Sequence, residues 1–249
     1  MQKFFVAGMP RTGSTLLATT LDQNPKIKMH GELFHPVMTE RAGPHALNVR
    51  GKPRFFDPDA EDAIAFLSKE VWSNRGLKKH AVGFKLFGDY VKAPTTDKLF
   101  LRILEAFPDV KLVTIWRENL LDCLISRQVA RSSGKWMESS KSNQSETNVV
   151  MVEIAPAMAE NFFQGYSNVK TFLGQISSEV PSFSVDYDEL TNNFESVSAN
   201  LFDFLGVSAS AVNQAIKKQR THTRKDYVVN WEELKNHFSE TPYAQFFED

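Results

Sequence analysis

Cysteine is almost absent from this chain, since Cys123 is the only one among 249 residues. A single thiol cannot form an intrachain disulfide or a cysteine-based zinc site. Its position among apolar helix residues favours packing over nucleophilic catalysis. No apolar run approaches the roughly 20 residues that a membrane-spanning helix requires, and the apolar part of residues 1–8 is too short for a signal peptide. We therefore expect a cytoplasmic protein without stable membrane insertion.

An excess of charge of one sign is also missing. Lys and Arg total 29 and Asp and Glu total 30, which leaves a formal net charge of -1. General nucleic-acid binders usually carry a strong basic excess, so nucleic acid is not an expected partner. Any anionic ligand must instead meet a local cluster of basic groups. The length and the 42% of hydrophobic residues fit one domain that spans residues 1–249.

Strand-like and helix-like segments alternate along the chain. Apolar or β-branched runs predict strands at 3–7, 27–30, 81–87, 110–116 and 182–185. Apolar residues at helical spacing predict helices at 14–23, 59–74, 97–106, 119–130 and 193–205, with a long helix within 152–179 that is interrupted near Gly165. This alternation predicts an α/β fold with a parallel sheet of about five strands flanked by helices, with ligands beyond the carboxyl ends of the strands.

Two segments do not fit this alternation. Residues 33–58 are rich in proline and glycine, and residues 132–148 are rich in Ser, Asn, Lys and Glu. We expect both to be surface loops, the second a mobile one, and to form the walls and the lid of a binding site.

The first predicted strand runs into a glycine-containing turn. Residues 8–15 read Gly-Met-Pro-Arg-Thr-Gly-Ser-Thr and open the first helix. This frame is that of a nucleoside-triphosphate loop, except that Ser14 stands where the lysine should follow the second glycine. Backbone N–H groups, a helix N-terminus and two hydroxyls can still face an anion, and Arg11 can supply positive charge. ATPase chemistry, which uses that lysine, is not expected.

Residues 10–17 strongly resemble the 5′-phosphosulfate loop of the sulfotransferase superfamily, and look closest to the bacterial branch that sulfates carbohydrates and lipopolysaccharide. The resemblance implies a P-loop-like fold and 3′-phosphoadenosine-5′-phosphosulfate (PAPS) as the sulfuryl donor. It also implies that the donor is bound by Arg11, Thr12, Gly13, Ser14, Thr15 and Leu16.

The donor's 3′-phosphate needs a second set of basic groups. Residues 116–126 resemble the family's 3′-phosphate motif, an Arg at a strand end followed by a helical Ser, which assigns Arg117 and Ser126 to this role. Their separation is nine residues where the widely quoted spacing is eight, and the bacterial branch often has the longer form. The basic segment at 217–225 resembles the loop that closes over the 3′-phosphate and adenine, and its expected contacts are Lys218, Gln219 and Arg220.

Catalysis requires a base and cations near the transferred group. Glu32 follows the second predicted strand, where related sulfotransferases place the proposed general base, which must reach the acceptor hydroxyl. Lys85 interrupts an apolar strand, a costly position unless the charge is paired or used. The family has a similarly placed lysine, which implies that Lys85 stabilises the bridging oxygen. With Arg11, these residues form the predicted catalytic set.

Other functions are weighed against this one. His30, Glu32 and His35 are residue types that bind metals. Their two histidines are not at the helical i, i+4 spacing of a zinc motif, so we expect no metal. A nucleotide kinase or NTPase on the same fold, and a noncatalytic adenine-nucleotide-binding protein, stay open as alternatives. The acceptor, which we expect the loops at 33–58 and 132–148 to enclose, is also open. Hydroxyl groups of sugars, lipid-linked sugars and small metabolites are all candidates, and the resemblance to the bacterial branch makes a carbohydrate the first choice.

Overall fold

The computed structural model describes residues 1–34, 47–49, 52–54, 63–73, 78–87, 94–134, 149–214 and 222–248. Its internal contacts divide the chain into two units. The first unit comprises Met1–Trp116 and Val169–Asn213, and the second comprises Arg117–Asn168 and Gln214–Asp249.

A parallel sheet of five strands forms the centre of the first unit. Its strands are β1 (Gln2–Gly8), β2 (Ile27–Glu32), β5 (Ala81–Phe87), β6 (Lys111–Trp116) and β7 (Ser182–Asp186). The spatial order is β2-β5-β1-β6-β7, and every neighbouring pair is parallel. The predicted fold class is thereby confirmed. All seven residues of β5 are buried, as expected for a strand covered on both faces.

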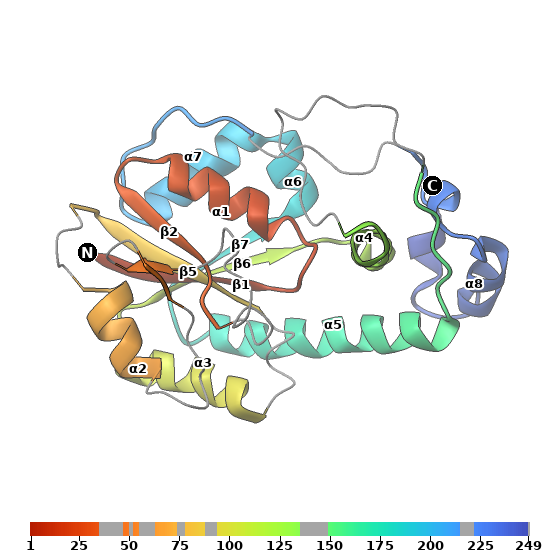
Figure 1. The fold of residues 1–249 in the computed structure, drawn as a ribbon, viewed down its shortest axis with the longest axis horizontal. Helices are drawn as coiled ribbons and strands as arrows, with labels where there is room; N and C mark the ends of the chain where they lie inside the picture. Colours follow the sequence, from red (N-terminus) through yellow and green to blue (C-terminus); the bar gives the residue numbers. More distant parts are fainter. Residues whose placement is uncertain are drawn as a thin grey trace. The chain divides into compact units, whose positions relative to one another are not determined.

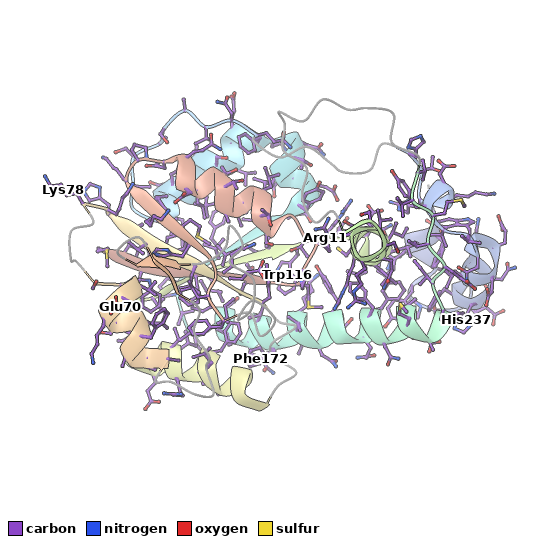
Figure 2. The ribbon with its side chains drawn as sticks, in the orientation of Figure 1. Arg11, Glu70, Lys78, Trp116, Phe172 and His237 are labelled. Carbon is purple, nitrogen blue, oxygen red and sulfur yellow. The ribbon has the colours of Figure 1, made fainter. Side chains whose placement is uncertain are left out.

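Helices cover both faces of this sheet (Figure 1). On one face lie α1 (Ser14–Gln23), α6 (Tyr187–Asn192) and α7 (Phe194–Phe204). On the other lie α2 (Ala63–Phe66), α3 (Pro94–Ala106) and the C-terminal part of α5 (Pro156–Ser177). Figure 2 labels Phe172 of α5, whose ring centroid lies 5.6 Å from that of Phe100 on α3. The ring centroid of Phe100 also lies 5.6 Å from that of Phe5 on β1, so aromatic packing joins this face of the sheet to its helices.

Outside the main sheet, two segments differ from the structure that the sequence predicts for them. Within the predicted surface loop at 33–58, β3 (Leu47–Val49) and β4 (Lys52–Arg54) form a separate antiparallel pair. The helix predicted at 59–74 is found as α2 followed by a π-helical turn, η1 (Leu67–Val71), while residues 59–62 and 74 lie outside the described residues. Residues 135–148, the main part of the predicted lid, also lie outside them.

The interruption predicted near Gly165 is wrong, because α5 continues through this position without a break. Glycine costs about 1 kcal/mol in a helix interior relative to alanine. On the same helix Phe163, Tyr166 and Val169 are buried. Each buried apolar side chain of this size contributes about 1.5–3 kcal/mol, which outweighs the glycine.

The second unit contains α4 (Leu120–Ser133), the first part of α5, η3 (Lys225–Tyr227), α8 (Trp231–Phe238) and η4 (Ala244–Phe247). An isolated parallel bridge joins Val152 to Val228. The core is aromatic: the ring of Phe163 packs against those of Phe238, Tyr243 and Phe246. The basic and aromatic C-terminal segment is thus tied to the start of α5.

Candidate functional site

The turn between β1 and α1 holds an unusual backbone. Arg11 has φ 72° and Gly13 has φ 88°, both in the left-handed region. Arg11 is the one non-glycine residue with positive φ among the described residues, a conformation that is sparsely populated and is concentrated at functional sites. Figure 2 shows Arg11 beyond the carboxyl end of β1. The predicted turn between the first strand and the first helix is therefore present, and its backbone is strained.

Internal bonds and packing fix this loop. The buried Thr12 hydroxyl donates to the Met9 carbonyl over 2.7 Å, and this hydrogen bond closes the turn. Gly13 stands at the N-cap of α1, where a Cβ would overlap the ring of Tyr187. Ser14 and Leu16 are buried, while Thr15 is half-buried. With no capping side chain on Gly13, the N-terminus of α1 suits an anion.

Lys85, Glu32 and Thr15 meet beside this loop. The Lys85 Nζ lies 3.0 Å from Glu32 Oε1 and 3.3 Å from Thr15 Oγ1. The side chain of Lys85 is 2% exposed and that of Glu32 is 14% exposed. The Lys85 Nζ also lies 5.0 Å from the centroid of the Phe87 ring. Burial of this ammonium is offset by a carboxylate, a hydroxyl and an aromatic face.

Strand pairing explains how these residues come together. In the parallel β2–β5 pair Glu32 lies opposite Lys85, after a register shift between Met29 and Glu32. On the other side of β5, Lys85 lies opposite Val6 of β1, the strand that leads into the loop. The irregular end of β2 therefore places a carboxylate at the same edge of the sheet as the loop.

In the second unit, Arg117 is held at both its side chain and its backbone. Its Nη2 donates to Asp122 Oδ2 over 2.6 Å. Its backbone N–H donates to Tyr166 Oη over 3.0 Å, and that hydroxyl donates back to the Arg117 carbonyl over 3.3 Å. Arg117 is 6% exposed. The guanidinium of the predicted 3′-phosphate motif is thus buried and fixed.

A second arginine joins the same carboxylate. Arg224 Nε donates to Asp122 Oδ1 over 3.1 Å, and its Nη1 donates to the Glu248 carbonyl over 2.9 Å. Ser126 lies one turn after Asp122 on α4 and is half-buried. The predicted contacts at Lys218, Gln219 and Arg220 lie outside the described residues.

Sequence reasoning did not single out Asp122, Arg224, Tyr166 or Tyr187. Asp122 stands between the two assigned residues of the 116–126 motif, and Arg224 belongs to the basic segment at 217–225. Asp122 could have been found by asking which carboxylate would accompany a buried arginine. Arg224 could have been found by extending the expected contacts of the basic segment beyond residues 218–220. Nothing in the local sequence marks Tyr166 or Tyr187, whose contacts depend on distant elements.

His30 lies two residues before Glu32 on β2. Its Nε2 is buried and has no hydrogen-bond partner among the described residues. Burial, and then the positive charge of Lys28, lower the pKa of His30 from 6.5 to about 4, although Asp22 opposes the shift. Within the described ranges, no group of three or more His, Cys, Asp or Glu side chains could hold a metal ion.

The position of Cys123 agrees with a packing role, because its side chain is buried. None of the helices in the described part of the chain has the length and apolar character needed to cross a lipid bilayer.

Comparison with known proteins adds independent findings. A family model described as "Sulfotransferase family" matches residues 3–211. Nodulation protein H of Rhizobium meliloti (strain 1021) is 27% identical over 251 residues, which cover 99% of this chain and 95% of that protein. Nodulation protein H of Rhizobium tropici is 24% identical over 250 residues, which cover 99% of this chain and 93% of that protein.

Solved structures are similar in fold. The sulfotransferase domain from the curacin biosynthetic pathway has a TM-score of 0.53 at 14% identity and covers 99% of this chain and 95% of its own. A sulfotransferase from Alicyclobacillus acidocaldarius has a TM-score of 0.50 at 18% identity and covers 100% of this chain and 94% of its own.

Proposed function

The chain belongs to the sulfotransferase family, and from this premise we propose that it transfers a sulfuryl group from PAPS to a hydroxyl group of a carbohydrate or small metabolite. Sulfuryl transfer in general follows from membership of this family of enzymes. The identity of the donor, the class of acceptor and the roles of single residues are the proposal.

The observation that carries the proposal is the contact of Lys85 with Glu32 and Thr15. A buried lysine and a carboxylate lie together beside a loop whose backbone suits an anion. Sulfuryl transfer resembles phosphoryl transfer, since its catalysis is mainly positioning and charge stabilisation together with a base for the acceptor. The cluster offers both a cation and a base.

The residues at the loop fit the phosphosulfate half of PAPS. The ring of Tyr187 occupies the space that a Cβ at position 13 would need, so this position requires glycine. The first turn of α1 offers backbone N–H groups that no capping side chain binds. Arg11 adds a guanidinium fork that suits tetrahedral oxyanions. Ser14 replaces the lysine of a nucleoside-triphosphate loop, which favours PAPS over ATP with Mg²⁺. Arg117 and Ser126 are assigned to the 3′-phosphate.

When bound, PAPS supplies a sulfur that bonds to the acceptor oxygen while its bond to the 5′-phosphate oxygen breaks. The Glu32 carboxylate accepts the proton of the acceptor hydroxyl. The Lys85 ammonium stabilises negative charge on the leaving 5′-phosphate oxygen, together with Arg11 and the N–H groups of the loop. Because Lys85 pairs with Glu32 before reaction, it also holds that carboxylate at the edge of the loop.

The proposal is tested first by binding. Calorimetry without metal should give a Kd for 3′-phosphoadenosine-5′-phosphate (PAP) in the micromolar range or tighter, about -8 kcal/mol or better. Arg117→Ala should abolish this binding. Arg131→Ala makes the same charge change on an exposed position of α4 and should leave the Kd unchanged. A preference for ATP with Mg²⁺, or no effect of Arg117→Ala, would instead favour the kinase hypothesis.

A second measurement separates an enzyme from a noncatalytic binder. Labelled sulfate from PAPS should appear on hydroxyl acceptors in a screen of sugars, small metabolites, phenols and peptides. Glu32→Gln should abolish transfer while PAP still binds. Transfer only to phenols or peptides would reject the carbohydrate and metabolite assignment, and binding without any transfer would point to a sensor.

A further inference from the structure

Asp122 is the meeting point of two arginines in the second unit. Its Oδ2 accepts from Arg117 Nη2 over 2.6 Å and its Oδ1 accepts from Arg224 Nε over 3.1 Å. The side chains of Asp122, Arg117 and Arg224 are 9%, 6% and 23% exposed, respectively. One carboxylate therefore holds two cations that come from segments about 100 residues apart, in a largely buried place.

The local structure fixes the carboxylate itself. Asn119 caps α4, and its Oδ1 accepts from the Asp122 backbone N–H over 3.2 Å. Asp122 lies in the first turn of the helix, where the dipole stabilises negative charge. Asn119 Nδ2 in turn donates to the Phe246 carbonyl over 3.1 Å. The start of α4 and the C-terminal segment are thus joined around this group.

Arg224 is fixed by the same segment. Its Nη1 donates to the Glu248 carbonyl, while its Nε is bound to Asp122. Two guanidinium groups on one carboxylate would repel each other without it, more strongly as burial lowers the effective dielectric constant. The carboxylate removes this repulsion and sets the orientation of both planar groups.

We propose that Asp122 is a positioning residue for the donor's 3′-phosphate: it presents Arg117 and Arg224 as one preformed pair of guanidinium groups. This inference rests on the proposed function, which assigns Arg117 to the 3′-phosphate. A preformed pair binds a phosphate without the cost of ordering two long side chains. If the ion pair served only folding, its loss would not depend on whether the bound nucleotide carries a 3′-phosphate.

The test compares two nucleotides that differ in this phosphate. PAP and adenosine 5′-monophosphate (AMP) share the adenosine and the 5′-phosphate, and AMP lacks the 3′-phosphate. In the natural chain PAP should bind more tightly than AMP. Asp122→Asn should weaken PAP binding by about 10- to 100-fold, the range for a charge-assisted hydrogen bond. Binding of AMP should stay within about twofold.

Matched variants define the controls. Asp203→Asn makes the same change at an exposed position of α7 and should leave the affinity ratio of PAP to AMP as it is. Asp122→Glu retains the charge and should recover part of the ratio. Should Asp122→Asn fail to fold, Arg224→Gln, which keeps the Arg117–Asp122 pair, should lower the ratio in the same direction.

The outcomes separate the two claims. Equal binding of PAP and AMP by the natural chain overturns the assignment of the 3′-phosphate in the proposed function. A clear preference for PAP that survives Asp122→Asn or Arg224→Gln overturns the positioning role alone. A parallel loss of PAP and AMP binding in Asp122→Asn also overturns it, because the residue then acts only through the fold.

Discussion

Lys85 is a buried charge on the strand next to β1, and its removal should have two separable effects. Lys85→Met deletes the ion pair with Glu32, so the free energy of unfolding should fall by about 2–4 kcal/mol. Turnover with an identified acceptor should fall by about 10²- to 10³-fold, because a cation at the leaving oxygen is lost. Urea denaturation and transfer of labelled sulfate measure the two quantities.

A double variant distinguishes folding from catalysis at this pair. Lys85→Met with Glu32→Gln leaves no charge in the pair, so most of the lost stability should return. Turnover should remain as low as in the single variant. Recovery of turnover together with stability would mean that Lys85 only supports the fold.

The members of this cluster were predictable as residue types but their contact was not. Thr15 followed from the loop motif, Glu32 from its place after a strand, and Lys85 from a charge inside an apolar run. Their meeting depends on the pairing of β2 with β5 and on an irregular register. Local sequence patterns do not specify which distant strand pairs with which, so the distances could only come from the structure.

His30 makes stability depend on pH. With its pKa lowered from 6.5 to about 4, the unfolded chain binds a proton in this interval that the folded chain does not. Stability is therefore lost as pH falls through this window. Relative to His30→Gln, the natural chain should lose up to about 3 kcal/mol between neutral pH and about pH 4, at 1.36 kcal/mol per unit of pKa.

Comparison with variants isolates this contribution from the carboxylates, which titrate in the same range. Urea unfolding of the natural chain and His30→Gln is measured at each pH and subtracted. His80→Gln makes the same substitution at an exposed position and controls for the effect of the glutamine itself. Identical pH dependence of the natural chain and His30→Gln would show that His30 titrates alike in both states.

At the scale of elements, the loop before α1 depends on Gly13. Alanine there faces both a left-handed φ of 88° and overlap with the Tyr187 ring. Gly206 has φ 71° but open space around its Cβ position, so it reports the backbone term alone. We expect Gly206→Ala to cost about 1 kcal/mol and Gly13→Ala about 2–4 kcal/mol, because the second also displaces a ring.

Urea denaturation measures both costs, and calorimetry with PAP shows whether the loop has moved. PAP affinity should fall in Gly13→Ala and stay unchanged in Gly206→Ala. Equal costs in the two variants would contradict the proposed support of the loop by Tyr187.

Element boundaries were predicted well where the sequence carries a stop signal. The first helix was expected at 14–23 and is found at Ser14–Gln23, between Gly13 and Pro25. The strand expected at 81–87 is likewise found at Ala81–Phe87. In α5 the glycine signal misled, since burial of neighbouring side chains overrides the local preference at Gly165.

At the scale of the molecule, alternation of strands and helices predicted a parallel sheet but not its order. The chain passes from β1 to β2 and leaves a position between them that β5 fills later. Handedness rules constrain each crossover without fixing such an insertion. The order matters for the site, because it brings β5 and its Lys85 next to both the loop strand and β2.

Cooperative unfolding would distinguish one domain from two. The chain passes between the two units after Trp116, Asn168 and Asn213, and the second passage lies inside helix α5. Because helix formation is cooperative, loss of one unit should free the part of α5 that belongs to the other. We therefore expect one calorimetric transition, with a van't Hoff enthalpy equal to the calorimetric enthalpy.

Core variants in each unit sharpen this test. Phe84 of the first unit and Phe238 of the second are both fully buried, and each alanine substitution should cost about 3–5 kcal/mol. If the chain is a single domain, both variants should lower the midpoint temperature of the same single transition. Two resolved transitions, with Phe84→Ala shifting one and Phe238→Ala the other, would instead establish the units as separate domains, because a cavity then destabilises only the unit that contains it.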